Sequence, residues 1–211
     1  PADGSIDGAA YSYSPNDCSV GDVDGDGQYE LIVKWDPNNS KDNSQSGKTG
    51  NVYLDCYRLF TGEKLWRIDL GVNIRAGAHY TQFLVYDFDK DGKAELICKT
   101  APGSKDGTGA YVNQAADLAT IKSASNTKEW RDSNGRINGG HEYLTVFEGL
   151  TGKAIHTIAY WPNRNAKTEL SDASGSFNWD DRSGKSDKGN YGNRGERYLA
   201  TVAYLGGADE R

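Results

Sequence analysis

Two stretches of sequence decide the fold: DVDGDGQYELIVK at residues 22–34 and DFDKDGKAELICK at residues 87–99. They lie 65 positions apart and align without a gap. Each consists of a nine-residue acidic loop followed by a short apolar run. A repeat of this kind indicates an architecture built from equivalent structural units.

The acidic loops have the ligand spacing of a calcium site. Carboxylates stand at loop positions 1, 3, 5 and 9, position 6 is a glycine, and position 7 offers its backbone carbonyl. Ca²⁺ prefers such oxygen ligands, and glycine permits the positive-φ turn that returns the later ligands to the ion. The sequence therefore predicts one Ca²⁺ in each loop, held by Asp22, Asp24, Asp26, Gln28 and Glu30 in the first and by Asp87, Asp89, Asp91, Lys93 and Glu95 in the second.

Strands are expected on both sides of these loops. The apolar runs 31–33 and 96–98 lack helical periodicity and read as buried strands. A second repeat, residues 52–68 against residues 142–158, consists of two alternating segments joined at a Thr-Gly turn, which predicts a hairpin. Each unit then has four antiparallel strands, so the sequence predicts an all-β protein built from β-propeller blades.

The spacing of the repeats sets the expected blade boundaries. The first blade is predicted at about 17–70 and the second at about 79–160, with an insertion at 101–140. A further insertion at 161–192 precedes the start of a third blade at 196–211, where two glycines replace the acidic loop. Because blades bury their faces against neighbours, and because the chain lacks methionine, we expect it to be a fragment of a longer propeller.

Composition limits the kinds of partner and compartment. The net charge is -6 and no basic patch is visible, which argues against nucleic-acid binding. No apolar run is long enough to span a membrane. The many glycines and tyrosines suit short strands and turns, and we expect a secreted monomer. Cys18, Cys56 and Cys98 are expected as buried apolar residues, with a bridge between Cys18 and Cys56 left open.

The segments between the acidic loops carry a family resemblance. The chain resembles polysaccharide lyase family 11, the rhamnogalacturonan lyases, in the motifs at 19–27, 34–37, 41–47, 73–83 and 142–149. The resemblance implies an eight-bladed, calcium-binding propeller that cleaves the rhamnose-galacturonate backbone of pectin (rhamnogalacturonan I) by β-elimination. The alternative is a calcium-binding adhesion or carbohydrate-binding propeller without catalysis.

Substrate contacts are predicted by matching the chain to the family motif. Asn16 and Asp36 are the candidates for binding sugar hydroxyls. The competing interpretation is an Asx turn at Asn16 and a turn before proline at Asp36. Asp17 is expected to be an additional calcium or turn ligand.

The elimination needs a cation near the galacturonate carboxylate and a base for the C5 proton. The candidates in this chain are Arg75, His79 and Arg194, and a base elsewhere in the ring is the alternative. Lys34 and Lys99 occupy the same position in both repeats, which favours an architectural role. The isolated chain is expected to be inactive.

Overall fold

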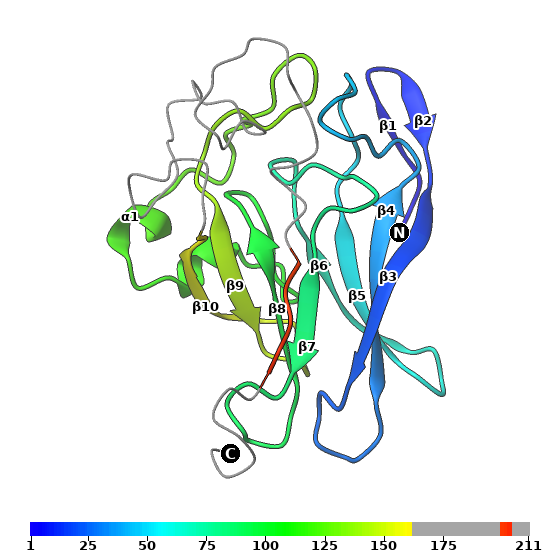
Figure 1. Cartoon of the computed structure of the whole chain (residues 1–211), viewed down its shortest axis with the longest axis vertical. Coiled ribbons are helices and arrows are strands. Elements are labelled where there is room, and N and C mark those ends of the chain that lie inside the picture. Colours follow the sequence, from blue (N-terminus) through cyan, green and yellow to red (C-terminus); the bar gives the residue numbers. More distant parts are fainter. Residues whose placement is uncertain (162–198, 204–211) are drawn as a thin grey trace.

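The computed structural model describes residues 1–161 and 199–203. It is an all-β structure of three antiparallel sheets with very little helix (Figure 1). The elements are β1 (Gly4–Ile6), β2 (Ala9–Tyr11), β3 (Tyr13–Gly21), β4 (Glu30–Pro37), β5 (Tyr53–Arg58), β6 (Lys64–Asp69), β7 (Phe83–Tyr86), β8 (Glu95–Thr100), the 3-10 turn η1 (Val112–Ala115), α1 (Ala119–Lys122), β9 (Tyr143–Phe147) and β10 (Ala154–Ala159).

The two large sheets repeat one topology. The first has the strand order β3-β4-β5-β6 and the second β7-β8-β9-β10, so each strand pairs with the next one in the chain. The predicted strands at 31–33 and 96–98 and both predicted hairpins are confirmed. The pair β1-β2, a hairpin near the N-terminus, was not predicted.

The two sheets pack against each other through one apolar core. Ile32, Leu54 and Ile68 of the first sheet are fully buried in this core with Leu96 and Phe147 of the second. Side chains alternate between the faces of a strand, so Lys34 and Asp36 lie on the same face as Ile32, the face turned toward the second sheet.

Close contacts fix how the sheets meet. Strand β3 contacts β7, and a side chain at Gly21 would clash with Val85 and Ala94. The indole nitrogen of Trp66 donates a hydrogen bond of 2.7 Å to the Gly149 carbonyl. The sheets therefore form one packed body rather than two separate domains.

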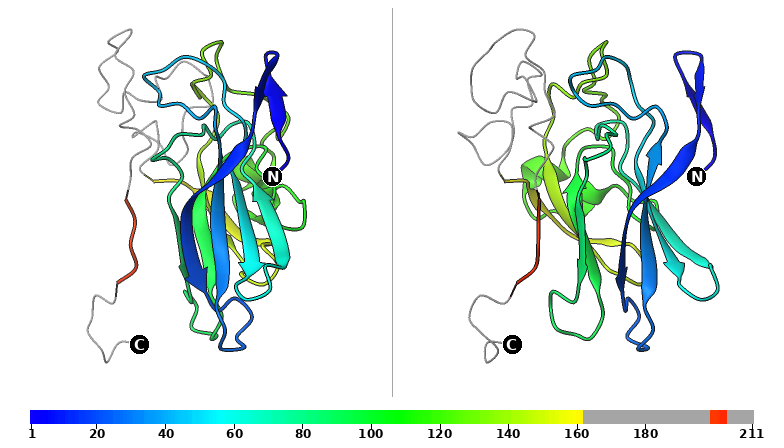
Figure 2. Two further views of the ribbon diagram at one scale, coloured as in Figure 1. Left: turned by 90° about the vertical axis from the view of Figure 1, so that its right-hand side faces the viewer. Right: turned by 45° about the vertical axis from the view of Figure 1, so that its right-hand side comes forward.

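The loops divide between the two ends of this body. Figure 2 shows the acidic loops after β3 and β7 at one end and the long connections after β4 and β8 at the other. The second connection contains η1 and α1. The Thr157 hydroxyl holds η1 against β10 by donating to the Val112 carbonyl at 2.8 Å.

Several predicted segments lie wholly or partly outside the described residues. The insertion at 161–192 and most of the predicted third blade lie outside them, and residues 199–203 have no strand assignment. Among residues 1–161 and 199–203, no helix has the length and apolar content needed to cross a membrane. Two four-stranded sheets are the content expected of two blades, and the closed ring stays a prediction.

The cysteines are all free. Cys56 and Cys98 are buried as expected, and burial raises the pKa of each thiol to about 12. Cys18 is exposed, so the expectation that it fills the core was wrong. It lies on the part of β3 that borders a cavity rather than on the core face.

Candidate functional site

The first acidic loop is organised by the side chain of Asp22. Its Oδ1 accepts hydrogen bonds from the amides of Gly25 and Asp26 at 2.7 and 3.1 Å, and its Oδ2 accepts from Gly27 at 2.9 Å. Gly27 has a φ of +84°, as its place at position 6 predicted. One carboxylate therefore folds the loop around itself.

The second loop repeats this hydrogen-bond set. Asp87 Oδ1 accepts from the amides of Lys90 and Asp91 at 2.7 and 3.2 Å, and its Oδ2 accepts from Gly92 at 3.0 Å. Lys90 has a φ of +67° where the first loop has Gly25. The two loops thus share a backbone conformation although their sequences differ at position 4.

Part of the predicted calcium ligand set converges in each loop. Carboxylate oxygens of Asp22, Asp24 and Glu30 lie within 4.8 Å of one another, and so do those of Asp87, Asp89 and Glu95. Burial raises the pKa of Glu30 and Glu95, with smaller contributions from the neighbouring aspartates. Three carboxylate oxygens this close together could coordinate a divalent cation such as Ca²⁺.

The remaining predicted ligands are not part of these clusters in the described loops. The Asp26 Oδ1 accepts the amide of Gln28, and the Asp91 Oδ1 accepts the amide of Lys93, both at 2.8 Å. Their carboxylates cap the turn after position 5. The roles of Asp26, Gln28, Asp91 and Lys93 as ligands stay predictions.

The two loops differ in their nearest positive charge. Arg58 lies 3.0 Å from Asp24 Oδ2 and 3.4 Å from Glu30 Oε1. Its guanidinium lowers the pKa of Asp24. Glu148 stands at the matching position in the second hairpin, where it accepts a hydrogen bond from the Thr151 hydroxyl. The sequence patterns did not single out Arg58, which lies beside Glu30 because β4 pairs with β5.

A second group of polar residues lies at the opposite end of the first sheet. Asp36 is only 5% exposed, and neither of its carboxylate oxygens has a hydrogen-bond partner among the described residues. Burial raises its pKa to about 6, while the nearby Lys34 ammonium acts in the opposite direction and Asp17 adds to the rise. A buried carboxylate without a partner is unusual, and both of its oxygens lack exposed surface.

The neighbouring strand carries Asn16. Pairing between β3 and β4 shifts register between Pro15 and Cys18, so Asn16 and Asp17 together oppose Lys34 in a β-bulge. Asn16 is exposed, and a bulge is a common means of redirecting side chains beside a binding site. The two predicted substrate residues therefore lie on adjacent strands at one end of the sheet.

Asp17 forms an ion pair with a buried lysine. Its Oδ2 lies 2.5 Å from the Nζ of Lys34, which is fully buried and also donates to the Tyr80 carbonyl at 2.8 Å. Asp17 lies within β3 rather than in a turn, so the turn part of the expectation was wrong. Its role as an additional calcium ligand stays a prediction.

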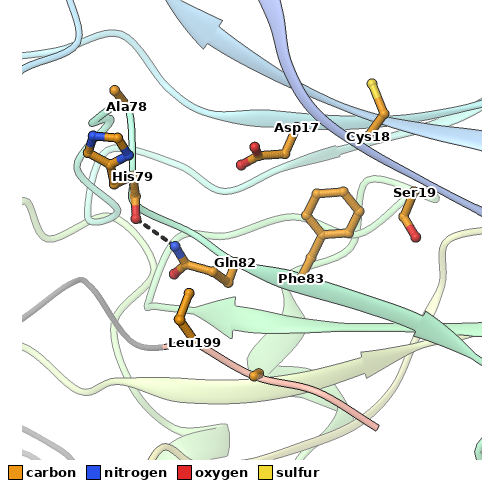
Figure 3. Close-up of a pocket in the computed structure, with 9 residues that line it drawn as sticks. Asp17, Cys18, Ser19, Ala78, His79, Gln82, Phe83 and Leu199 are labelled. Carbon is orange, nitrogen blue, oxygen red and sulfur yellow. Dashed lines mark hydrogen bonds between the residues drawn. The ribbon is translucent and has the colours of Figure 1, made fainter.

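His79 and Asp17 border the same cavity, of about 590 Å³, between β3 and the segment before β7 (Figure 3). His79 is exposed, and its carbonyl accepts a hydrogen bond from the Gln82 side chain at 2.6 Å. Of the predicted catalytic residues, His79 has its side chain at an open surface.

Arg75 is placed differently, since it is 3% exposed. Its guanidinium donates to the backbone carbonyls of Lys41, Asp42, Gln45, Gly47, Asn134 and Gly135. These bonds tie the connection after β4 to the one before β9, and a catalytic role would require some of them to break. The geometry favours an anchoring role. Arg194 lies outside the described residues.

Comparison with known proteins decides the family. The family model for the C-terminal domain of rhamnogalacturonan lyase family 11 matches residues 1–210. This chain belongs to rhamnogalacturonan lyase family 11.

Two relatives in this family come from Bacillus subtilis (strain 168). The chain is 53% identical over 200 residues to the rhamnogalacturonan endolyase YesW and 51% identical over 202 residues to the rhamnogalacturonan exolyase YesX. Each match covers 95% of this chain and 28% of the relative. The chain therefore spans little more than a quarter of the length of these proteins.

Solved structures of family 11 lyases are similar to this one. The Bacillus licheniformis rhamnogalacturonan lyase PL11 superposes with a TM-score of 0.70 at 56% identity, and YesW with a TM-score of 0.70 at 57% identity. Each match covers 78% of this chain and 26% of the solved one.

Proposed function

We propose that this chain is part of a secreted, calcium-binding rhamnogalacturonan lyase, which cleaves the rhamnose-galacturonate backbone of pectin by β-elimination. The observation that carries the proposal is the 53% identity to an endolyase named for this substrate, over 95% of the chain. The almost equal identity to an exolyase leaves the cleavage mode open.

In this proposal the two large sheets are neighbouring blades of a propeller, at about 17–70 and 79–160. Their identical strand order supports it, as does the contact between the first strands β3 and β7, which would line the central axis. The substrate would cross the end of the propeller that carries the long connections.

Asn16 and Asp36 would bind sugar hydroxyls at that end. The absence of a hydrogen-bond partner at the buried Asp36 oxygens among the described residues supports this assignment, and so does the exposure of Asn16 at the bulge. His79 borders the cavity from the next segment and is the candidate of this chain for the base or for the charge beside the galacturonate carboxylate. Arg75 and Arg194 remain weaker candidates.

The proposed Ca²⁺ sites are structural. Each loop joins two strands of one sheet, at the end opposite the long connections (Figure 1). A bound ion there would offset the repulsion among clustered carboxylates and hold the turn. In the first loop, backbone amides and the Arg58 side chain hold the carboxylates in place.

The test is to incubate the protein, at its full natural length, with rhamnogalacturonan and to follow the ultraviolet absorbance of the unsaturated uronate product. Product formation that falls in Asp36→Ala, with bound calcium unchanged, supports the proposal. Binding of the polysaccharide without product would instead favour a carbohydrate-binding propeller. Residues 1–211 alone are expected to form no product, because an incomplete cleft cannot hold the reacting groups in place.

A further inference from the structure

The connection after β8 crosses the outer edges of both sheets. The backbone of Lys105 pairs with that of Asp69 in β6, with N···O distances of 2.7 and 3.0 Å. Two residues later, the amide of Gly107 donates to the Gly152 carbonyl at 2.8 Å, in the turn before β10. The connection therefore bridges β6 and β10, the last strands of the two sheets.

A cavity of about 330 Å³ lies where this connection meets η1 and the start of β10. Its lining includes Thr108 and Tyr111 of the connection, Gln114 of η1, and Lys153 and Ile155 beside and within β10. β10 and β7 form opposite edges of the second sheet (Figure 1), and three strand spacings separate them by about 14 Å. This cavity is therefore separate from the larger one beside β7.

Asp106 fixes the wall of this outer cavity. Its Oδ1 accepts hydrogen bonds from the amides of Thr108 and Ala110 at 2.9 and 3.0 Å, and its Oδ2 accepts from the amide of Ala154 at 3.0 Å. The Thr108 hydroxyl adds a bond of 2.7 Å. Asp106 is 4% exposed, so its carboxylate holds the turn, and the exposed polar groups of the cavity come from other residues.

Positive charge gathers at the outer cavity. Lys153 lines it and is exposed, and the Nζ of the exposed Lys105 lies 5.4 Å from the centre of the Tyr111 ring. In the part of the chain that the structure describes, neither ammonium group has an acidic partner within ion-pair distance. Two such lysines beside a cavity attract an anionic ligand, although the whole chain has a net charge of -6.

The other lining residues fit a sugar ring. Tyr111 is half-buried and Ile155 is 50% exposed, so apolar surface lies beside the charge. The exposed Gln114 donates from its amide nitrogen to Asn113 Oδ1 at 3.2 Å, while its Oε1 accepts no hydrogen bond from the described residues. Apolar surface with a few placed polar groups is the usual lining of a small-molecule site.

We propose that the outer cavity is a second binding site for the acidic polysaccharide, in which Lys153 binds the carboxylate of a galacturonate residue and Gln114 and Tyr111 contact its hydroxyls and ring. The inference rests on the proposed function, because galacturonate is the acid of rhamnogalacturonan. The volume is at the low end for small-molecule sites, so the cavity holds a short segment of a chain that is cleaved elsewhere on the protein.

Titration calorimetry of the full-length protein with trigalacturonate measures this site directly, because the probe carries the carboxylates and lacks the rhamnose-galacturonate bond. Lys153→Glu should weaken binding at one site about tenfold or more, and Lys153→Arg should retain it. Added salt should weaken the same site, and neutral galactotriose should not bind there. Lys64→Glu, the same charge change on an exposed lysine of the first hairpin, is the matched control and should bind as the wild type does.

Activity gives a second measurement. With long rhamnogalacturonan, Lys153→Glu should raise KM about threefold or more and leave kcat unchanged, because a second attachment point raises the effective concentration of the chain at the cleft. With the shortest oligosaccharides that are cleaved, both constants should equal those of the wild type. If Lys153→Glu does not fold, Gln114→Ala decides, since it removes an exposed side chain and should weaken trigalacturonate binding about threefold.

The outcomes separate the two proposals. Equal affinity for trigalacturonate in the wild type and Lys153→Glu, an equal loss in Lys153→Glu and Lys64→Glu, or equal binding of galactotriose would each overturn the second site while the lyase assignment stands. A wild type that forms no product, with trigalacturonate binding that is lost in Lys153→Glu, would overturn the lyase assignment and leave the binding site in place.

Discussion

The two sheets share their strand order, their acidic loops and a lysine on the second strand, but they surround that lysine differently. In the first sheet Lys34 meets Asp17 on the neighbouring β3, whereas in the second Lys99 meets Glu142 before β9. The lysine occupies the matching position in both sheets, whereas its acidic partner lies on β3 in the first sheet and before β9 in the second. The comparison shows that the backbone of the unit is repeated, and that the position of each counter-charge is specific to one sheet.

The same distinction holds at the loops. Asp22 and Asp87 make equivalent hydrogen bonds to their own backbones. Arg58 reaches only the first loop, from the hairpin beside it. Local sequence therefore sets the shape of a loop, and the partner strand sets its charge balance. Substitutions at matching positions test how far the two repeats are equivalent.

The largest effects should come from the carboxylates that fold the loops. Asp22→Ala and Asp87→Ala each remove the acceptor of three backbone amides, so each should lower the free energy of unfolding by about 2 to 4 kcal/mol. Chemical denaturation of residues 1–211 in the presence of chelator measures this without any contribution from a metal. Asp24→Ala, which removes a carboxylate with fewer such bonds, is the control. Clearly unequal losses for Asp22 and Asp87 would break the equivalence of the loops.

Asp36 should make the stability of the first sheet depend on pH. The second sheet has Ala101, which does not titrate, at the matching position. The folded-state pKa of Asp36 is about 6, above the usual 3.8, so the native state binds more protons than the unfolded state between these values. Its contribution to the free energy of unfolding then falls as pH rises through this window. Asp36→Asn lacks this fall, so it should gain stability relative to the wild type, by up to about 3 kcal/mol.

The measurement for Asp36 is denaturation of both proteins at pH 4 and pH 7. Comparing differences between the two proteins cancels the titration of the other carboxylates. A constant difference between wild type and Asp36→Asn would mean that Asp36 is solvated and has an ordinary pKa.

Calcium should stabilise both repeats, and the second more strongly. Binding to the native state adds about 2.7 kcal/mol for each site when free calcium is 100 times Kd, and chelation should remove this stabilisation. Because Arg58 already offsets charge in the first loop, Arg58→Glu should increase the calcium dependence of the melting temperature and Glu148→Arg should decrease it. Titration calorimetry of the same variants counts the ions. A melting temperature that does not change when chelator is added would contradict the assignment of calcium sites to the two loops.

The smallest effect concerns loop position 4. Lys90 has a φ of +67° where Gly25 has +78°, and this conformation strains a residue with a side chain by about 1 to 2 kcal/mol. Glycine loses about 0.5 to 1 kcal/mol more in chain entropy on folding. Lys90→Gly should therefore stabilise by about 0.5 to 1 kcal/mol, and Gly25→Ala should destabilise by a similar amount. Opposite signs from these in thermal denaturation would show that the loops differ in backbone conformation.

The sequence by itself determined the all-β class, the strands after each acidic loop and the turn conformation of the loops. These features depend on neighbouring residues: an aspartate binds amides a few positions later, and an apolar run without helical period forms a strand. The convergence of Asp22, Asp24 and Glu30 follows for the same reason.

Only the tertiary structure decided which charges meet. Asp17 contacts Lys34 because a bulge shifts the register of β3, and Arg75 is buried because two distant connections present their carbonyls to it. Asp36 has its altered pKa because the packing of the chain removes it from water. Burial and long-range electrostatics depend on segments far apart in the sequence, so a local sequence pattern does not predict them.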